Sequence, residues 1–109
     1  MPFTGKSLAD GFVASSQGAL YTVPAVTTAY LSSLSLFCDT ATPQTVQLYL
    51  KQSGGTARKW RRYVFNQQYD HAEVFENGAR LVLQAGDTVE AVTTTASVVA
   101  YFITGVEET

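Results

Sequence analysis

The sequence predicts an all-β fold, and three features lead to that prediction. The chain has 109 residues, the common size of one domain. β-branched and aromatic residues are abundant, and no amphipathic stretch is long enough for more than a turn or two of helix. Apolar residues recur at every second position in several segments, and clusters of turn-forming residues separate these segments. We therefore expect one core built from many short strands.

The alternation is clearest between Thr45 and Lys51, where Val46, Leu48 and Leu50 alternate with polar or amphipathic side chains. The same reasoning predicts nine strands, at residues 8–14, 19–23, 28–38, 45–51, 58–65, 72–75, 79–83, 88–93 and 98–104. Eight or nine short strands separated by turn signals indicate an antiparallel β-sandwich, either immunoglobulin-like or a jelly roll. Residues 18–109 form this sandwich in our interpretation.

Turn chemistry supports these boundaries. The pair Asn77-Gly78 is the strongest hairpin signal in the chain. Asp87 follows a glycine, and an aspartate in such a turn binds backbone N–H groups with its carboxylate. We therefore assign Asp87 a structural role rather than a catalytic one.

Composition and motifs exclude several classes of function. The net charge of −2 argues against a dedicated nucleic-acid binder that depends on phosphate neutralisation. The single cysteine, Cys38, excludes an internal disulfide and fits the apolar row of its strand. His71, the only histidine, lacks the converging ligands of a metal site. Catalytic motifs and Gly-rich phosphate loops are missing too, so we expect neither an enzyme nor a cofactor.

A basic cluster stands out in the middle of the chain, because four of the seven basic residues fall within five positions. The cluster consists of Arg58, Lys59, Trp60, Arg61, Arg62 and Tyr63. In a regular strand Arg58, Trp60 and Arg62 point to one face, and Lys59, Arg61 and Tyr63 to the other. Three interpretations stay open: an edge strand whose charges prevent aggregation, a docking site for an acidic protein surface, and a weak grip on nucleic acid. Asp70, Glu73 and Glu76 are candidate partners of the arginines.

Two further segments indicate contacts with other subunits. Residues 98–103 are apolar at every position, so some large side chains, with Phe102 the candidate, point away from the core. The alternative is a central strand that is covered on both faces. Residues 1–17 are expected to form an N-terminal arm and first edge strand. In it Phe3 is an exposed hook, and Leu8, Phe12 and Val13 pair with the same or a neighbouring subunit, unless the terminus is simply frayed.

Several strand and turn phrases carry a family likeness. They are the segments 20–25 (LYTVPA), 46–50 (VQLYL), 81–91 (LVLQAGDTVEA) and 103–107 (ITGVE). In these phrases the chain resembles small all-β virion proteins of tailed bacteriophages, over roughly residues 8–107. The basic cluster departs from that pattern, and so does Val26, which stands where a turn glycine is usual.

This resemblance implies a structural protein of the virion, made in the host cytoplasm. Its concrete form is a capsid decoration or cement protein that binds the assembled head as a homo-oligomer such as a trimer, with the major capsid protein as a partner. The alternative is a neck, collar, baseplate or fibre-associated component of the tail. A further alternative, from fold analogy, is a carbohydrate-binding module that uses Trp60, Tyr63 and Tyr69. The predicted protein contacts are made by Phe3, Arg58, Trp60, Arg61, Arg62, Tyr63 and Phe102. No membrane contact is expected, because no stretch approaches the length of an apolar span.

Overall fold

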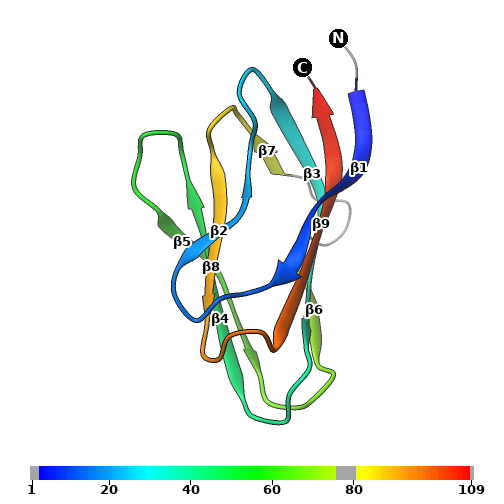
Figure 1. Ribbon diagram of the computed structural model, residues 1–109, viewed down its shortest axis with the longest axis vertical. Helices are drawn as coiled ribbons and strands as arrows, with labels where there is room; N and C mark the ends of the chain where they lie inside the picture. The colour runs from blue at the N-terminus through cyan, green and yellow to red at the C-terminus, as the bar shows by residue number, and fades with distance from the viewer. Residues whose placement is uncertain (1–2, 76–80, 109) are drawn as a thin grey trace.

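The computed structural model describes residues 3–75 and 81–108, and for residues 3–7 only the backbone. The described residues form nine strands and no helix (Figure 1). The strands are β1 (Phe3–Phe12), β2 (Gly18–Thr22), β3 (Thr28–Cys38), β4 (Gln44–Lys51), β5 (Arg58–Phe65), β6 (His71–Glu73), β7 (Leu81–Leu83), β8 (Thr88–Thr93) and β9 (Val99–Glu108). Each overlaps one of the predicted strands, although β1 begins five residues before its predicted start and β9 ends four residues after its predicted end. The predicted Asn77-Gly78 hairpin lies outside the described residues.

The strands form two antiparallel sheets. Sheet A has the order β1-β9-β3-β6, with β7 also paired to β3, and sheet B has the order β2-β8-β4-β5. Strand β3 pairs with β9 along one edge, so β6 and β7 share its other edge, at opposite ends of the strand. The pairing is nested along the chain: the first strand, β1, pairs with the last, β9, and β2 pairs with β8. The innermost pair is the hairpin of β4 and β5. This nesting, with β6 and β7 counted as one interrupted strand, is the topology of a jelly roll.

The core lies between the inner faces of the two sheets. Leu31, Leu34 and Leu36 from β3 meet Leu48 from β4 and Ile103 from β9, and all five are almost completely buried. Burial of each such side chain contributes about 1.5–3 kcal/mol. The alternation of buried and less buried residues along β4 and β8 confirms the half-buried strands that the sequence predicts. The described residues contain no helix that could cross a membrane.

Strand β9 lies in the middle of sheet A, between β1 and β3. Val99, Tyr101 and Ile103 point into the core, whereas Phe102 is exposed on the outer face. The sequence left two interpretations of residues 98–103: a strand covered on both faces, or one with an outward-facing contact at Phe102. Nothing in the same chain covers Phe102 among the described residues, so the first interpretation is wrong at this position.

Strand β5 corrects one prediction about the basic cluster. The pairing of β4 with β5 shifts its register between Leu48 and Tyr49, which leaves Trp60 as an extra residue on β5. Such a β-bulge breaks the strict alternation of side chains. Trp60 and Tyr63 consequently both pack against the core, and their predicted placement on opposite faces is wrong.

The N-terminal segment, predicted over residues 1–17, adds to the sheet of its own chain. Strand β1 pairs with β9 along its whole length and forms one edge of sheet A (Figure 1). Leu8 packs against the core, Val13 is fully buried, and Phe12 is exposed. The side chain of Phe3, the predicted hook, lies outside the described residues.

Candidate functional site

The outer face of sheet A carries four exposed aromatic side chains. They are Phe12 on β1, Phe37 on β3, Phe102 on β9 and Tyr69 in the loop before β6, with exposed fractions of 58%, 37%, 49% and 63%. We call them the aromatic face. Strand register brings them together, because both Phe12 and Phe37 pair with Ala100, two residues from Phe102. The small side chain of Ala100 leaves the three rings around it accessible.

Tyr69 is held in an unusual backbone conformation. Its φ of 68° lies in the left-handed region, which non-glycine residues rarely adopt. Two backbone hydrogen bonds enforce this conformation, from Tyr69 N–H to Cys38 O (2.7 Å) and from Cys38 N–H to Asp70 O (2.8 Å). The ring stacks on Phe37 with 6.0 Å between centroids. A strained residue that presents an exposed ring is typical of a functional position.

Polar groups border the aromatic face. Ser35 on β3 and Asp10 on β1 both pair with Phe102. Ser35 donates a hydrogen bond to the carboxylate of Glu73 on β6, at 2.8 Å to the nearer oxygen. An apolar centre with a polar rim is the anatomy of a protein–protein interface.

The basic cluster forms the free edge of sheet B, where β5 is the last strand. Its four cations, Arg58, Lys59, Arg61 and Arg62, are all exposed. The guanidinium carbon of Arg61 lies 5.6 Å from the centroid of the Trp60 ring. The other three cations make no ion pair or hydrogen bond with any described residue. These charges are therefore available to a partner.

Two of the three acidic residues predicted to pair with the arginines, Asp70 and Glu73, do not do so within the described part of the chain. Glu73 is on β6 of the other sheet and accepts a hydrogen bond from Ser35. Asp70 takes part in the loop through its backbone and forms no ion pair with β5 among the described residues. Glu76 lies outside the described residues.

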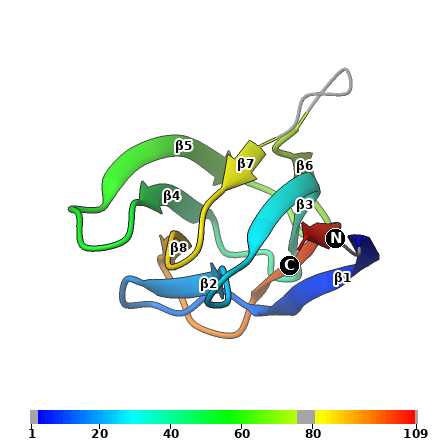
Figure 2. The ribbon, with the colours of Figure 1, turned by 90° about the horizontal axis from the view of Figure 1, so that it is seen from above.

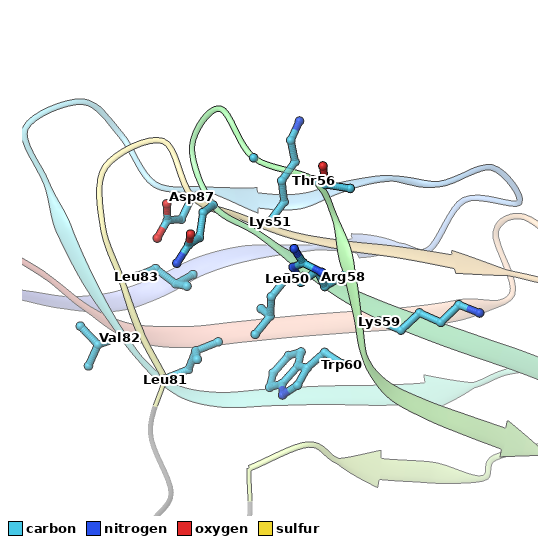
Figure 3. A pocket seen from close by; sticks show the side chains of 12 residues that line it. Leu50, Lys51, Thr56, Arg58, Lys59, Trp60, Leu81, Val82, Leu83 and Asp87 are labelled. Carbon is cyan, nitrogen blue, oxygen red and sulfur yellow. The ribbon is translucent and has the colours of Figure 1, made fainter.

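Strands β5 and β7 lie near each other at the edges of sheets B and A (Figure 2). Residues of both strands line a pocket of about 520 Å³ (Figure 3). Asp87 lies at its rim, and its carboxylate accepts hydrogen bonds from the backbone N–H groups of Ser53 and Gln84, both at 3.0 Å. The aspartate thus ties the β4–β5 loop to the β7–β8 turn, which confirms its predicted turn role.

The residues considered for catalysis are not arranged for it. Cys38 is fully buried on the inner face of sheet A. His71 pairs with Phe37 and is exposed, so its imidazole and the thiol point to opposite sides of the sheet. Within residues 3–75 and 81–108 no group of three or more His, Cys, Asp or Glu side chains could hold a metal ion.

Two tyrosine–carboxylate hydrogen bonds secure the end of β9. The Tyr21 hydroxyl on β2 donates to the Glu107 carboxylate and so links sheet B to sheet A. Burial, reinforced by this bond, raises the pKa of Tyr21 well above its ordinary value of 10. Tyr30 donates to Glu108 at 3.0 Å, and this bond raises the pKa of Tyr30. Both pairs favour the neutral phenol, and the Tyr21 pair joins the two sheets.

The predicted contact residues therefore separate into two surfaces on different sheets. Phe102 belongs to the aromatic face, whereas Arg58, Trp60, Arg61, Arg62 and Tyr63 belong to β5. The sequence interpretation did not assign Phe37 to a contact. It considered Phe12 only as part of an edge strand and Tyr69 only as a ring for carbohydrate binding, so it did not place either beside Phe102. The sequence did hold one signal for this face: Phe37 is apolar at a position where the alternation along its strand predicts a polar, outward-facing residue.

The three rings suggested for carbohydrate binding do not share one platform. Trp60 lies against Phe75 and Tyr63 against Phe65, and both pack on the core. Tyr69 belongs to the aromatic face. A glycan site built from all three rings is therefore not formed.

No protein-family model, curated protein or solved structure matches the chain. The function must therefore be argued from the surfaces described above.

Proposed function

We propose that this protein is a structural component of a bacteriophage particle, and specifically a decoration or cement protein that binds the outside of the head as a homo-oligomer. Two lines of argument support the proposal. The strand and turn phrases of the sequence resemble small all-β virion proteins, and the jelly roll is a common architecture of viral capsid domains. Because one fold supports many functions, the surfaces carry the rest of the argument.

The aromatic face is the observation that carries the proposal. Taking about 150–250 Å² for each aromatic side chain, the four exposed fractions correspond to roughly 400 Å² of aromatic surface. That area lies within the roughly 300–600 Å² of the largest apolar patch on a typical monomer, a patch that is often functional. A standard interface buries about 800 Å² on each partner. The four rings would thus supply about half of one interface, and the polar rim would supply the rest.

The geometry favours a second copy of this chain as the occupant of the aromatic face. The face is carried by the three neighbouring strands β1, β9 and β3 with one adjoining loop, and Asp10 beside Phe102 belongs to its polar rim. A patch of that kind can pair with itself around a symmetry axis, which is how most homo-oligomers form.

The basic cluster offers a second, independent contact on sheet B. Three of its cations, Arg58, Lys59 and Arg62, pair with no described residue, and these charges complement an acidic protein surface. Charges at the border of an interface set orientation and association rate more than affinity. The protein would then have two contact surfaces, one for its own copies and one for an acidic partner such as the major capsid protein. Such a protein is suited to bridging the subunits of a lattice.

Mass spectrometric counting of copies per purified phage particle tests the proposal. Hundreds of copies are the expected result for a head decoration protein. A small multiple of three, five or six would instead place the protein in the neck or tail, since those structures have rotational symmetry. Absence from purified particles would overturn the proposal.

A further inference from the structure

The pocket between β5 and β7 combines apolar walls with unpaired positive charge. Leu50, Trp60 and Leu81 form apolar wall, and Lys51, Arg58 and Lys59 also line it. Figure 3 shows Arg58 beside Leu50, with Trp60 on one side of them and Lys51 on the other. Its volume of about 520 Å³ falls within the range of about 300–1,000 Å³ that is usual for ligand sites.

The charge balance of the pocket favours an anionic occupant. None of the three cations makes an ion pair or hydrogen bond with a described residue. Among the described lining residues Asp87 carries the one carboxylate, and it already accepts two backbone hydrogen bonds in its loop. Arg58 lies beside the apolar wall, while Lys51 and Lys59 extend outward at the border of the pocket (Figure 3), and no described counter-charge is committed to any of the three.

The position of the pocket favours an extended chain. It lies between two open sheet edges, because β5 ends sheet B and β7 pairs only with β3. An extended peptide can add its backbone to such an edge, and its side chains then alternate between two sides. We propose that this pocket binds an extended segment of a partner protein in which acidic and apolar side chains alternate. The acidic groups meet Arg58, Lys51 and Lys59, and the apolar groups contact Leu50, Trp60 and Leu81.

The contacts of Trp60 argue against a saccharide in the same place. Its ring already lies 5.8 Å from the Phe75 ring, centroid to centroid, and 5.6 Å from the guanidinium carbon of Arg61. A sugar that stacks on an aromatic platform needs a free ring face. An aliphatic side chain can instead pack against the edge of the Trp60 ring and the neighbouring leucines, so it does not require a free ring face.

Trp60 is the only tryptophan in the chain, so its intrinsic fluorescence reports on the pocket directly. The probe is a synthetic heptapeptide of alternating glutamate and valine with blocked ends, and the matched control peptide carries glutamine in place of glutamate. Titration of the purified full-length protein should give a saturable fluorescence change with the acidic peptide. The glutamine peptide should bind at least tenfold more weakly, because it makes no charge-assisted hydrogen bonds.

Two variants locate the binding. Arg58→Gln should weaken binding of the acidic peptide about tenfold, the loss expected for one hydrogen bond to a charged group. Arg62→Gln removes the same charge from the same strand outside the pocket lining, and should change the affinity by less than threefold. An equal loss in both variants would overturn the inference, because the charge effect would then be diffuse. Tighter binding of an oligogalacturonate or of a DNA duplex than of the peptide would overturn it as well.

This inference rests on the docking role proposed for β5, but its test does not use particles. Peptide binding by a protein that is absent from particles would leave the pocket assigned and the virion role refuted. If the protein is counted in particles but fails to bind the peptide, the virion role stands and the inference about the pocket is refuted.

Discussion

Gly105 tests the geometry of sheet A most sharply, because β3 and β9 approach each other closely at this residue. A Cβ atom added to Gly105 would lie 2.2 Å from the carbonyl oxygen of Tyr30 and 3.0 Å from the Cα atom of Leu31. Both are backbone atoms of β3, so no side-chain rotation can relieve the contact. The register of β3 shifts next to this point, between Leu31 and Ser33, which is where the close approach occurs.

The cost of Gly105→Ala follows from that contact. An ordinary separation of 3.4 Å requires the two backbones to move apart by about 1.2 Å, which stretches the nearest ladder hydrogen bonds beyond their normal range. Overpacking costs about 1–3 kcal/mol, and each lost hydrogen bond adds about 1 kcal/mol. We expect a loss of about 3 kcal/mol in the free energy of unfolding, which lowers the melting temperature by about 12–24 °C.

Urea unfolding monitored by the fluorescence of the single tryptophan measures this loss. Gly18→Ala is the matched control, because the nearest atom to its added Cβ would be 3.9 Å away and its φ is not positive. That variant should be neutral or more stable by about 0.4–1 kcal/mol. A loss below about 1 kcal/mol in Gly105→Ala would refute the close approach of β3 and β9.

Three further variants and one change of salt concentration have defined outcomes. Val26→Gly should raise the free energy of unfolding by about 0.5–1 kcal/mol, measured by urea titration. Val26 is exposed and has a φ of 58°, and the strain of a β-branched residue in this conformation exceeds the entropy that a glycine loses on folding. Tyr21 ionises at a lower pH in the unfolded chain than in the folded one, so its contribution to stability should be full below about pH 10 and fall above it. Tyr21→Phe should remove part of the alkaline loss of stability in urea titrations between about pH 8 and 11. Changing Arg58, Arg61 and Arg62 together to Glu should reduce incorporation into particles, counted by mass spectrometry, with an unchanged melting temperature. The rate at which the wild type associates with its partner should fall as salt rises, because screening acts over about 10 Å at 0.1 M salt.

Most of the fold was predictable because short-range rules determine it. The period of two along β4 and β8 identifies buried faces, and glycine, proline and aspartate identify the reversals. The sequence left the jelly roll and the immunoglobulin-like sandwich as equal alternatives, since the partner of each strand depends on contacts between residues far apart in the chain. The left-handed φ of Val26 agrees with the expectation of a turn glycine there.

The candidate site was less predictable, because it depends on register and on one irregularity. The bulge at Trp60 carries no sequence signature, yet it turns both Trp60 and Tyr63 toward the core. The aromatic face needs β1, β9 and β3 side by side before Phe12 and Phe37 come near Phe102. Periodicity predicts the face of a strand on which a ring lies, but not which rings of other strands lie beside it.

Sedimentation equilibrium of the wild type and two variants tests the central claim, which is that the aromatic face is a contact surface. Phe102→Asp removes about 100 Å² of exposed ring, and at about 25 cal/mol per Å² this weakens association by about 2.5 kcal/mol per copy. Val64→Asp is the matched control, because Val64 is similarly exposed, at 54%, but lies on β5 of sheet B. We predict that the wild type and Val64→Asp form species heavier than the 11.8 kDa monomer, whereas Phe102→Asp stays folded and monomeric. A wild type that stays monomeric at high concentration, or equal association of both variants, would contradict the claim.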